Sequence, residues 1–501
     1  MRFHLSSTIL MAITFCCTTS LTAAESIDID SRLELFVDDY LIDKMSGDAE
    51  LQLHRPSEGN LVMVYDRPWE GNRSGWQVIS RDGDSFRMYY CGSQIKLTKG
   101  GYSMPFCVTC YAESKDGIHW TRPELGLVEF NGSKKNNIIW NGEESNTFAP
   151  FKDTNPDCPP DQLYKAFALL SKNRKVRGLH VLKSPDGIHW SRMTKKPVIT
   201  KGYFDSYNQA FWDPLRGEYR EYHREFRDGR DIMTSTSKDF INWTEPEFLK
   251  YEPQRFTELY TNHTTPYYRA PHILLGFPTR YVAGRAMLTP LNERISRSKK
   301  RFGTDYTDGG FMTSRDAKTF KVWPEAFIRP GLVEKGRWVY GANFQNYGLI
   351  ETKSSIPGTP NELSIYASEG GWEENKKLRR HTLRIDGFVS VNASFAGGEF
   401  VTRPITFTGN ELALNYSTSA AGGIRVEIQT PDGKPIKGYT LDNCKDIFGD
   451  TLEGTVAWKG GSDLSKLAGK PLRLRFLLKD ADLYSMRFRP KKSTREYAAG
   501  R

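Results

Sequence analysis

Acidic residues stand near the beginnings of several expected β-strands, and two carboxyl groups that face one another can carry general acid–base chemistry. Hydrolysis of a glycosidic bond uses such a pair, roughly 5 Å apart for retention of configuration and roughly 6.5–9.5 Å apart for inversion. Each acid alone could equally be a turn former or an exposed charge. The candidate catalytic carboxylates are Asp66, Asp153, Asp205 and Glu258, with Glu70 as a further candidate for substrate binding.

Other side chains near these acids suit a ligand rich in oxygen. Trp69 and Tyr260 offer aromatic faces on which a sugar ring can stack. Arg224 and Arg280 can bind a hydroxyl, carboxylate or sulfate, because a guanidinium pairs with planar or tetrahedral oxyanions; a strand-end salt bridge is the alternative for Arg224. His263 could bind substrate, or contact a channel cation or water, but one histidine makes no metal site. We expect no cofactor, and leave open a structural channel cation such as calcium.

A recurring turn motif indicates the elements that must position these side chains. It reads ESKDGIHW at 113–120, KSPDGIHW at 183–190 and TSKDFINW at 236–243, with a worn copy at 313–320 and a truncated first one at 80–86. Ser and Asp can satisfy turn amides, Gly permits a positive φ, and the trailing aromatic can pack between neighbouring sheets. Five such units predict a five-bladed β-propeller, and an open array of β-sandwiches is the alternative.

The sequence pattern changes from about His381. Strand-like runs such as 424–428, which alternates apolar and polar residues, predict a β-sandwich there. The fold class expected is therefore all-β, a five-bladed β-propeller followed by a C-terminal β-sandwich. The expected boundaries are a signal peptide at 1–24, the propeller at 25–355, a linker at 356–380, the sandwich at 381–490 and a disordered tail at 491–501.

The first residues have the composition of an export signal. Arg2 gives a positive start, 9–15 an apolar centre, and small residues precede a cleavage point near Ala24. An uncleaved anchor is the alternative. No later stretch has the roughly 18 apolar residues that a membrane span needs. We expect a secreted or periplasmic protein without a membrane span, and a monomer.

The net charge favours one class of binding partner, and the cysteine content bears on disulfides and metal sites. The formal net charge of +10 suits an acidic partner, and for an exported protein an anionic polysaccharide fits better than nucleic acid. An odd and small number of cysteines argues against a disulfide scaffold, although one bridge is compatible with export. Cys107 and Cys110 have the spacing of half a zinc site but lack a second pair, so buried thiols are the better interpretation. The cysteines after the signal are Cys91, Cys107, Cys110, Cys158 and Cys444.

The repeated hairpins, with a sandwich behind them, resemble the five-bladed propeller glycosidases grouped around glycoside hydrolase families 43 and 32. The chain is also similar to a group of exported bacterial proteins that open with a phrase like LFVDDYLI, here 35–42, and close with one like KDADLYS, here 479–485. The second resemblance covers nearly the whole mature chain. The first covers the architecture alone, and a blade motif specifies no reaction.

The glycosidase resemblance implies three acids on the innermost strands of successive blades. By that resemblance Asp66 is the nucleophile or base, Asp153 orients the pair, and Glu258 is the general acid, with Asp205 as the substitute if the blades are counted differently. Neither the Asn-Asp-Pro nor the Glu-Cys signature of family 32 is present, and the glutamate falls one blade later than the family places it.

Three functions are compatible with these residues. The first is hydrolysis of glycosidic bonds in an extracellular poly- or oligosaccharide, which could be anionic or sulfated. The second is glycan binding without cleavage. The third is a lyase for uronic-acid polymers, with Tyr260 or His263 as base opposite a charge-neutralising Arg280. No nucleotide-binding glycine loop or serine elbow appears in the sequence, which gives phosphoryl transfer and esterase chemistry little weight.

Overall fold

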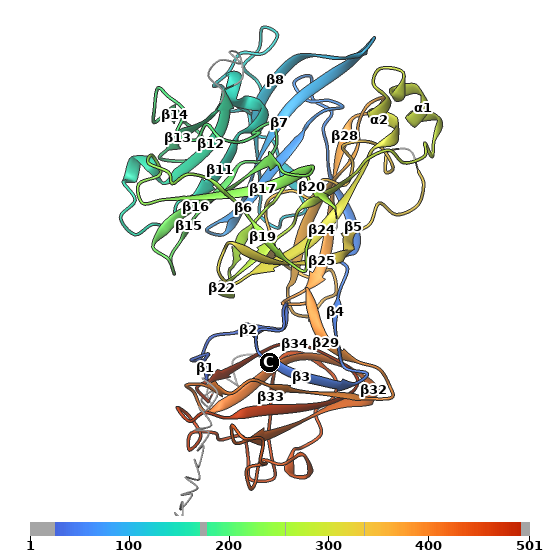
Figure 1. Cartoon of the computed structure of the whole chain (residues 1–501). Coiled ribbons are helices and arrows are strands. Elements are labelled where there is room, and N and C mark those ends of the chain that lie inside the picture. Colours follow the sequence, from blue (N-terminus) through green and yellow to red (C-terminus); the bar gives the residue numbers. More distant parts are fainter. Residues whose placement is uncertain (1–25, 171–177, 256, 335, 492–501) are drawn as a thin grey trace, which may run out of the picture.

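The computed structural model describes residues 26–170, 178–255, 257–334 and 336–491. Strands dominate it, and Figure 1 shows a propeller-like array of sheets above a second unit built around one eight-stranded sheet. The all-β prediction is confirmed, and so is the propeller-like arrangement. The predicted signal peptide at 1–24 lies outside the described residues, as does the predicted tail apart from Lys491.

The propeller-like unit consists of separate sheets whose strands follow one another in the chain. Most neighbouring strands are antiparallel, as hairpin connections require. The first sheet holds β6 (Gly75–Asp82), β7 (Ser85–Thr98), β8 (Gly101–Ser114), β9 (Trp120–Thr121) and β10 (Ile138–Trp140); the second β11 (Ala149–Lys152), β12 (Tyr164–Leu170), β13 (Gly178–Ser184) and β14 (Ser191–Arg192); the third β15 (Gln209–Asp213), β16 (Glu218–Phe226), β17 (Arg230–Ser237) and β18 (Glu247–Phe248). The fourth holds β19 (Lys250–Glu252), β20 (Glu258–Leu259), β21 (Thr265–Tyr267), β22 (Ala270–Gly276), β23 (Thr279–Val282), β24 (Tyr306–Ser314) and β25 (Thr319–Ile328).

The repeated motif forms the turn that its residue types predict. Ser114 Oγ accepts from the amides of Asp116 and Gly117 at 3.2 and 2.9 Å, and Asp116 Oδ1 accepts from Ile118 N at 2.8 Å. Trp120 packs edge-on against Tyr366 of a neighbouring sheet, with ring centroids 6.4 Å apart. The same serine-and-aspartate pattern recurs at 184–190, 237–243 and 314–319. The truncated copy differs: 80–86 is the β6–β7 hairpin itself, so counting it as a repeat was wrong.

A further sheet joins distant parts of the chain. It is formed by β26 (Ile350–Thr352), β27 (Glu362–Gly370) and β28 (Lys376–Arg384), with β5 (Ser57–Val64) paired to β28. The predicted linker at 356–380 is therefore wrong, since it holds β27 and the start of β28. In the first sheet the motif forms the turn between β8 and β9. Here β5 comes from the other end of the chain, so no turn joins it to β28 and this sheet has no copy of the motif.

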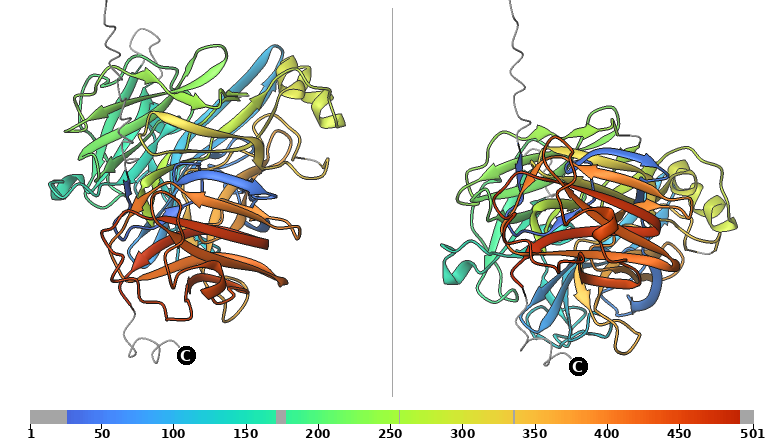
Figure 2. Two further views of the ribbon diagram at one scale, coloured as in Figure 1. Left: turned by 60° about the horizontal axis from the view of Figure 1, so that its bottom comes forward. Right: turned by 90° about the horizontal axis from the view of Figure 1, so that it is seen from below.

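The second unit combines both ends of the described chain. Because its sheet includes β2, β3 and β4, the predicted start of the propeller at residue 25 is wrong. β4 pairs with β29, and β3 pairs with β30; Figure 2 shows these N-terminal strands in blue among the orange and red ones. Whether the unit is a sandwich stays a prediction. Its strands are β2 (Glu34–Leu35), β3 (Ile42–Gly47), β4 (Glu50–Leu53), β29 (Val389–Ala393), β30 (Gly398–Thr402), β32 (Glu411–Gln429), β33 (Asp450–Thr455) and β34 (Arg473–Arg489), beside a small parallel pair, β1 (Ile27–Asp28) and β31 (Ile405–Thr406).

Helices are short and few in the described part. They are α1 (Pro290–Ser296), capped by Thr289, and α2 (Lys300–Thr304), with single 3₁₀ turns η1 (Glu143–Thr147), η2 (Pro160–Gln162) and η3 (Leu441–Asn443). Among the described residues, no helix has the length and apolar character that crossing a bilayer requires.

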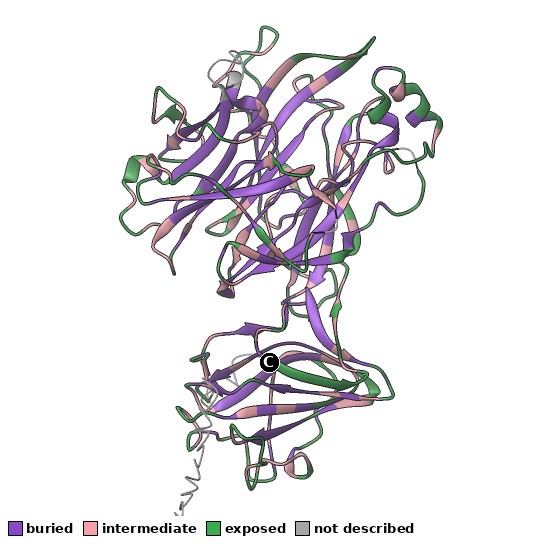
Figure 3. Ribbon diagram, viewed as in Figure 1, coloured by how far each residue is buried: buried purple, intermediate pink, exposed green. Residues whose placement is uncertain are grey.

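The inner strands meet in a buried aromatic core. β6 contacts β11 and β26, and β11 contacts β15. Trp76, Phe148, Tyr207 and Tyr260 belong to one apolar cluster there, and Figure 3 shows the strands of this region in the purple of buried residues. The segments that lead into these inner strands therefore gather at one end of the core, and they line the site described next.

Candidate functional site

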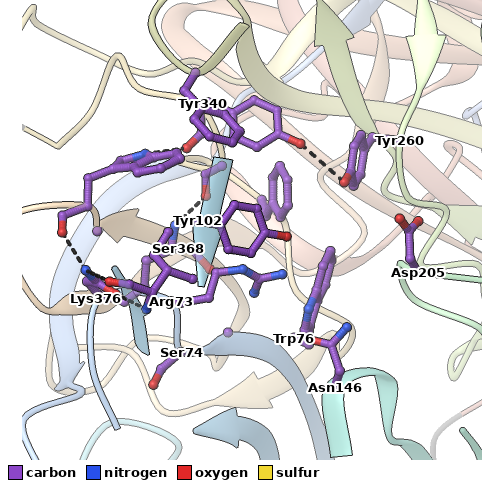
Figure 4. Close-up of a pocket in the computed structure, with 18 of the residues that line it drawn as sticks. Arg73, Ser74, Trp76, Tyr102, Asn146, Asp205, Tyr260, Tyr340, Ser368 and Lys376 are labelled. Atoms are coloured by element: carbon purple, nitrogen blue, oxygen red, sulfur yellow. Dashed lines mark hydrogen bonds between the residues drawn. The ribbon is translucent and has the colours of Figure 1, made fainter. Parts of the chain in front are cut away.

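A cavity of about 170 Å³ opens where the chain enters the inner strands. That volume exceeds the roughly 10–15 Å³ that one water needs and lies below the roughly 300–1,000 Å³ of drug-sized sites, so the cavity suits a small polar unit. Figure 4 shows the lining side chains. They come from the turn before β6 (Asn72, Arg73, Ser74) and the start of β6 (Gly75, Trp76), from Ile95 and Tyr102, from η1 (Asn146), from the segment before β15 (Asp205), from Tyr260, from α2 (Arg301, Phe302), from 340–344 (Tyr340, Gly341, Phe344), and from β27, β28 and their connection (Ser368, Gly371, Trp372, Lys376).

Aromatic side chains form much of the cavity wall. Trp76 packs between Tyr207 and Phe344, with ring centroids 5.0 and 5.5 Å away, and Tyr260 packs on Phe344 at 5.2 Å. Trp76 has a φ of +54°, a conformation that costs a bulky residue on the order of 1–3 kcal/mol. Its buried indole N–H has no hydrogen-bond partner among the described residues. This strained, unpartnered donor at a cavity is typical of a ligand contact.

Three cations line the cavity without a carboxylate partner within the described residues: Arg73, Arg301 and Lys376. Arg73 lies 5.5 Å from the ring centroid of Trp76, and Arg301 lies 5.2 Å from that of Tyr340. The Lys376 ammonium donates to the carbonyl of Gly341. Burial, together with the charge of Arg73, lowers the pKa of Lys376 to about 7. Elsewhere in the propeller-like unit most arginines are ion-paired, so this excess positive charge favours an anionic ligand.

Asp205 is the carboxylate of this lining. It is paired with the Arg224 guanidinium, and its side chain is 43% exposed while that of Arg224 is 3% exposed. Arg224 lies 4.7 Å from the ring centroid of Tyr260, and its Nε and Nη1 have no hydrogen-bond partner among the described residues. In Figure 4, Asp205 and Lys376 lie at opposite ends of the drawn residues, with Arg73 between them. The buried guanidinium therefore fixes an accessible carboxylate at the edge of the cavity.

Two phenols line the same cavity, and Figure 4 shows Tyr260 on the side of Asp205. The hydroxyls of Tyr260 and Tyr340 are 3.5 Å apart. Burial, and then the neighbouring Tyr260, raises the pKa of Tyr340 well above its ordinary value. Tyr340 therefore stays protonated at neutral pH and can donate a hydrogen bond.

Of the residues selected from the sequence, Asp205 and Tyr260 line the cavity and Arg224 supports them. His263 lies beneath it, fully buried, with its ring 4.2 Å from that of Tyr207. Burial lowers the pKa of His263 to about 3, so its imidazole is neutral. Within the described residues, no group of three or more His, Cys, Asp or Glu side chains is arranged to hold a metal ion.

The acids selected near the first inner strand gather around another cation. Asp66, 57% exposed, pairs with Arg122 at 2.9 Å. Glu70 is buried, accepts from Tyr90 at 2.6 Å, and has its pKa raised by burial. Trp69 donates its indole N–H to Asn137 at 2.7 Å. These side chains are absent from the cavity lining.

The remaining selected residues form separate ion pairs. Asp153, whose carboxylate has no exposed surface, pairs with Lys165 and accepts from Tyr219 at 2.6 Å. Glu258 pairs with Arg230 at 2.7 Å and lines a separate hollow. Arg280 holds Asp308 with two contacts of 2.6 and 2.7 Å. The structure thus does not gather the three expected acids in one cavity.

Sequence reasoning missed several cavity residues. Asn72 to Ser74 directly precede β6 and Trp76 is its second residue, and a glycine followed by tryptophan at the start of a strand was the available signal. Lys376 and Trp372 were hidden because their segment was assigned to a linker.

No protein-family model and no curated protein sequence matches the chain. Solved structures with a similar arrangement include several glycoside hydrolases and an N-acetylgalactosamine deacetylase. A glycosyl hydrolase from Bacteroides ovatus is 17% identical, with a TM-score of 0.39 over 66% of this chain and 93% of that one. A family 43 arabinoxylan arabinofuranohydrolase from Bacillus subtilis is 12% identical, with a TM-score of 0.40 over 84% and 96%. A family 62 α-L-arabinofuranosidase domain from Coprinopsis cinerea is 9% identical, with a TM-score of 0.41 over 66% and 99%. Likeness at this level carries no argument about a reaction, which must come from the site.

Proposed function

We propose that the protein is a glycoside hydrolase that binds an acidic sugar unit of an extracellular poly- or oligosaccharide in this cavity and cleaves its glycosidic bond with Asp205. One observation carries this proposal: three cations without carboxylate partners in the described chain surround an aromatic cavity that contains a single, accessible carboxylate. Five blades, a C-terminal sandwich and export after cleavage near Ala24 belong to the same proposal. The four motif turns and the closing β5–β28 pairing support the blade number.

Recognition would divide between rings and charges. The faces of Trp76 and Tyr260 are suited to the apolar side of a sugar ring. Arg73 can pair with a carboxylate or sulfate in bidentate fashion, and Lys376 adds a point charge. A neutral sugar would leave these cations uncompensated. Acidic sugars are therefore the expected substrates.

Bond cleavage would use Asp205 and a phenol. Asp205, oriented by Arg224, is the base or nucleophile at the anomeric carbon, and Tyr260, whose hydroxyl contacts that of Tyr340, gives a proton to the leaving oxygen. Water completes the hydrolysis. Its oxygen adds to that carbon as a hydroxyl group, and its other proton replaces the one that the phenol gave up. Most glycosidases use two carboxylates, but some replace one of them by a tyrosine that acts as the nucleophile.

A second candidate function is glycan binding without cleavage. The presence of one carboxylate in the described lining, where hydrolysis most often uses two, favours it. This candidate predicts the same preference for acidic sugars but no product.

The experiment offers the purified chain neutral, sulfated and uronic-acid polysaccharides, and records released reducing ends, unsaturated ends and bound glycan. Hydrolysis requires reducing ends without unsaturation, and Asp205→Asn should lower their release about 10²–10⁴-fold. Asp66→Asn is the matched control, because that exposed carboxylate lies outside the cavity lining, and should retain full activity. Melting curves confirm that both variants fold.

Each other outcome has a meaning. Retention of acidic glycan without product would move the assignment to the binding protein. Unsaturated ends would indicate a lyase. Full activity of Asp205→Asn, or loss of activity in Asp66→Asn, would overturn the role of Asp205.

A further inference from the structure

Cys91 and Cys107 lie on adjacent strands with their sulfur atoms in contact. In the β7–β8 ladder Cys91 is opposite Thr109 and Ser93 is opposite Cys107, so the two cysteines occupy diagonal positions on one face. Their Sγ atoms are 2.8 Å apart. Cys91 is buried and Cys107 half-buried.

The other cysteines are not placed to compete. Cys110 packs against Gly92 and joins a different apolar cluster from Cys91. Cys158 contacts Lys165 at 3.3 Å, and Cys444 lies in the second unit beside Val426. The geometry therefore selects one pair out of the five cysteines.

The surroundings of the pair support thiol chemistry. The S–H of Cys107, acting against burial and helped by the charge of Arg73, lowers the pKa of Cys91. The Cys91 sulfur and burial raise the pKa of Cys107. Since the thiolate is the nucleophile in disulfide exchange, Cys91 is suited to attack the Cys107 sulfur in the step that closes the bond.

We infer that Cys91 and Cys107 close a disulfide bond between β7 and β8 when the chain folds in an oxidising compartment. The oxidant is a protein disulfide of the oxidoreductase class. Cys107, the more exposed of the two, attacks that disulfide and forms a mixed disulfide, while its proton passes to the donor sulfur that leaves as a thiol. The Cys91 thiolate then attacks the Cys107 sulfur, the second donor sulfur leaves as thiolate, and the pair has lost two electrons and two protons to the donor.

This bond would restrain one wall of the cavity. Gly75 is opposite Cys91 in the β6–β7 ladder, and the amide of Arg73 donates to the carbonyl of Ser93 at 3.2 Å. The crosslink therefore restrains β6, which carries Trp76, and the turn before it, which carries Arg73. This holds for any ligand that the cavity binds. The inference does not depend on the proposed reaction, but it rests on the export that belongs to the proposed function.

The test produces the full chain behind an efficient export leader, alkylates free thiols without reduction, and maps peptides by mass spectrometry. The expected result is a Cys91–Cys107 crosslinked peptide, lighter by two hydrogen atoms than the reduced pair, with Cys158 and Cys444 alkylated. Alkylated Cys91 and Cys107, or a crosslink to another cysteine, would overturn the inference.

Substitutions give an independent readout. Cys91→Ser, Cys107→Ser and the double variant should lower the melting temperature by the same few degrees, because each removes one crosslink of a short loop. Cys158→Ser is the control and should melt like the parent. A dithiol reductant should bring the parent down to the level of the variants. Additive losses, or a parent melting temperature indifferent to the reductant, would count against the bond.

Discussion

Two buried lysines of the propeller-like unit have opposite surroundings. Lys165, 1% exposed, pairs with Asp153 and also contacts the Tyr219 hydroxyl at 3.3 Å. Lys376, 9% exposed, has a backbone carbonyl as its hydrogen-bond acceptor and the cationic Arg73 as a neighbour. One ammonium is compensated inside the fold, and the other is not.

The difference separates a structural residue from a ligand-binding one. A buried charge is costly unless it is paired, so a fold retains an unpaired one where something else compensates it. Protein groups surround the Lys165 ammonium and compensate its charge, so no ligand is needed there. Lys376 borders a cavity that also contains Arg73 and Arg301. The comparison therefore predicts a loss of stability at one lysine site and a loss of binding at the other.

The largest effect is expected at the compensated pair. Asp153→Asn should lower the free energy of unfolding by about 3–5 kcal/mol, because it leaves the Lys165 ammonium buried without its partner. Chemical denaturation followed by circular dichroism measures this loss. Asp161→Asn is the control in the same sheet: its ion pair with Lys183 is exposed, and the melting temperature should not change. Equal behaviour of the two variants would remove the contrast between the lysines.

What the sequence could predict of the fold was local. Ser114, Asp116 and Gly117 satisfy one another's hydrogen bonds within a few residues, so the motif specified its turn without reference to the rest of the chain. The pairing of β5 with β28 joins segments more than 300 positions apart, with no local mark in either. The linker at 356–380 was misassigned for that reason.

The site was predictable to a similar depth. Asp205 and Tyr260 were found because acids and aromatics before inner strands were sought. Asp153 and Glu258 met the same criterion, but a sequence does not reveal that Lys165 and Arg230 neutralise them. The cations that characterise the cavity come from a turn, a short helix and the supposed linker, so only the folded chain brings them together.

A smaller effect is expected at the uncompensated lysine. Lys376→Met should weaken binding of acidic oligosaccharide about tenfold or more, because a charged hydrogen bond contributes about 1.5–3 kcal/mol, while the free energy of unfolding changes by less than about 1 kcal/mol. Calorimetric titration and denaturation measure the two quantities. Lys377→Met is the matched control one position along β28, where the side chain pairs with Glu374 at 3.2 Å, and should bind normally. A large loss of stability with unchanged binding would place Lys376 with Lys165.

The smallest effect is a pH dependence that distinguishes the two roles of Lys376. Its pKa is about 7 in the folded chain and 10.5 ordinarily, so the unfolded chain binds more protons between these values, and the lysine's contribution to stability rises with pH across that window. Affinity for an acidic ligand should move the other way, decreasing above pH 7 as the ammonium loses its proton, while Arg73 and Arg301 stay charged. Titrations at pH 6 and pH 9 with the parent and Lys376→Met measure this directly. A decrease in affinity that persists in Lys376→Met would assign the titration to another group, and parallel changes in stability and affinity would contradict the site's need for a protonated lysine.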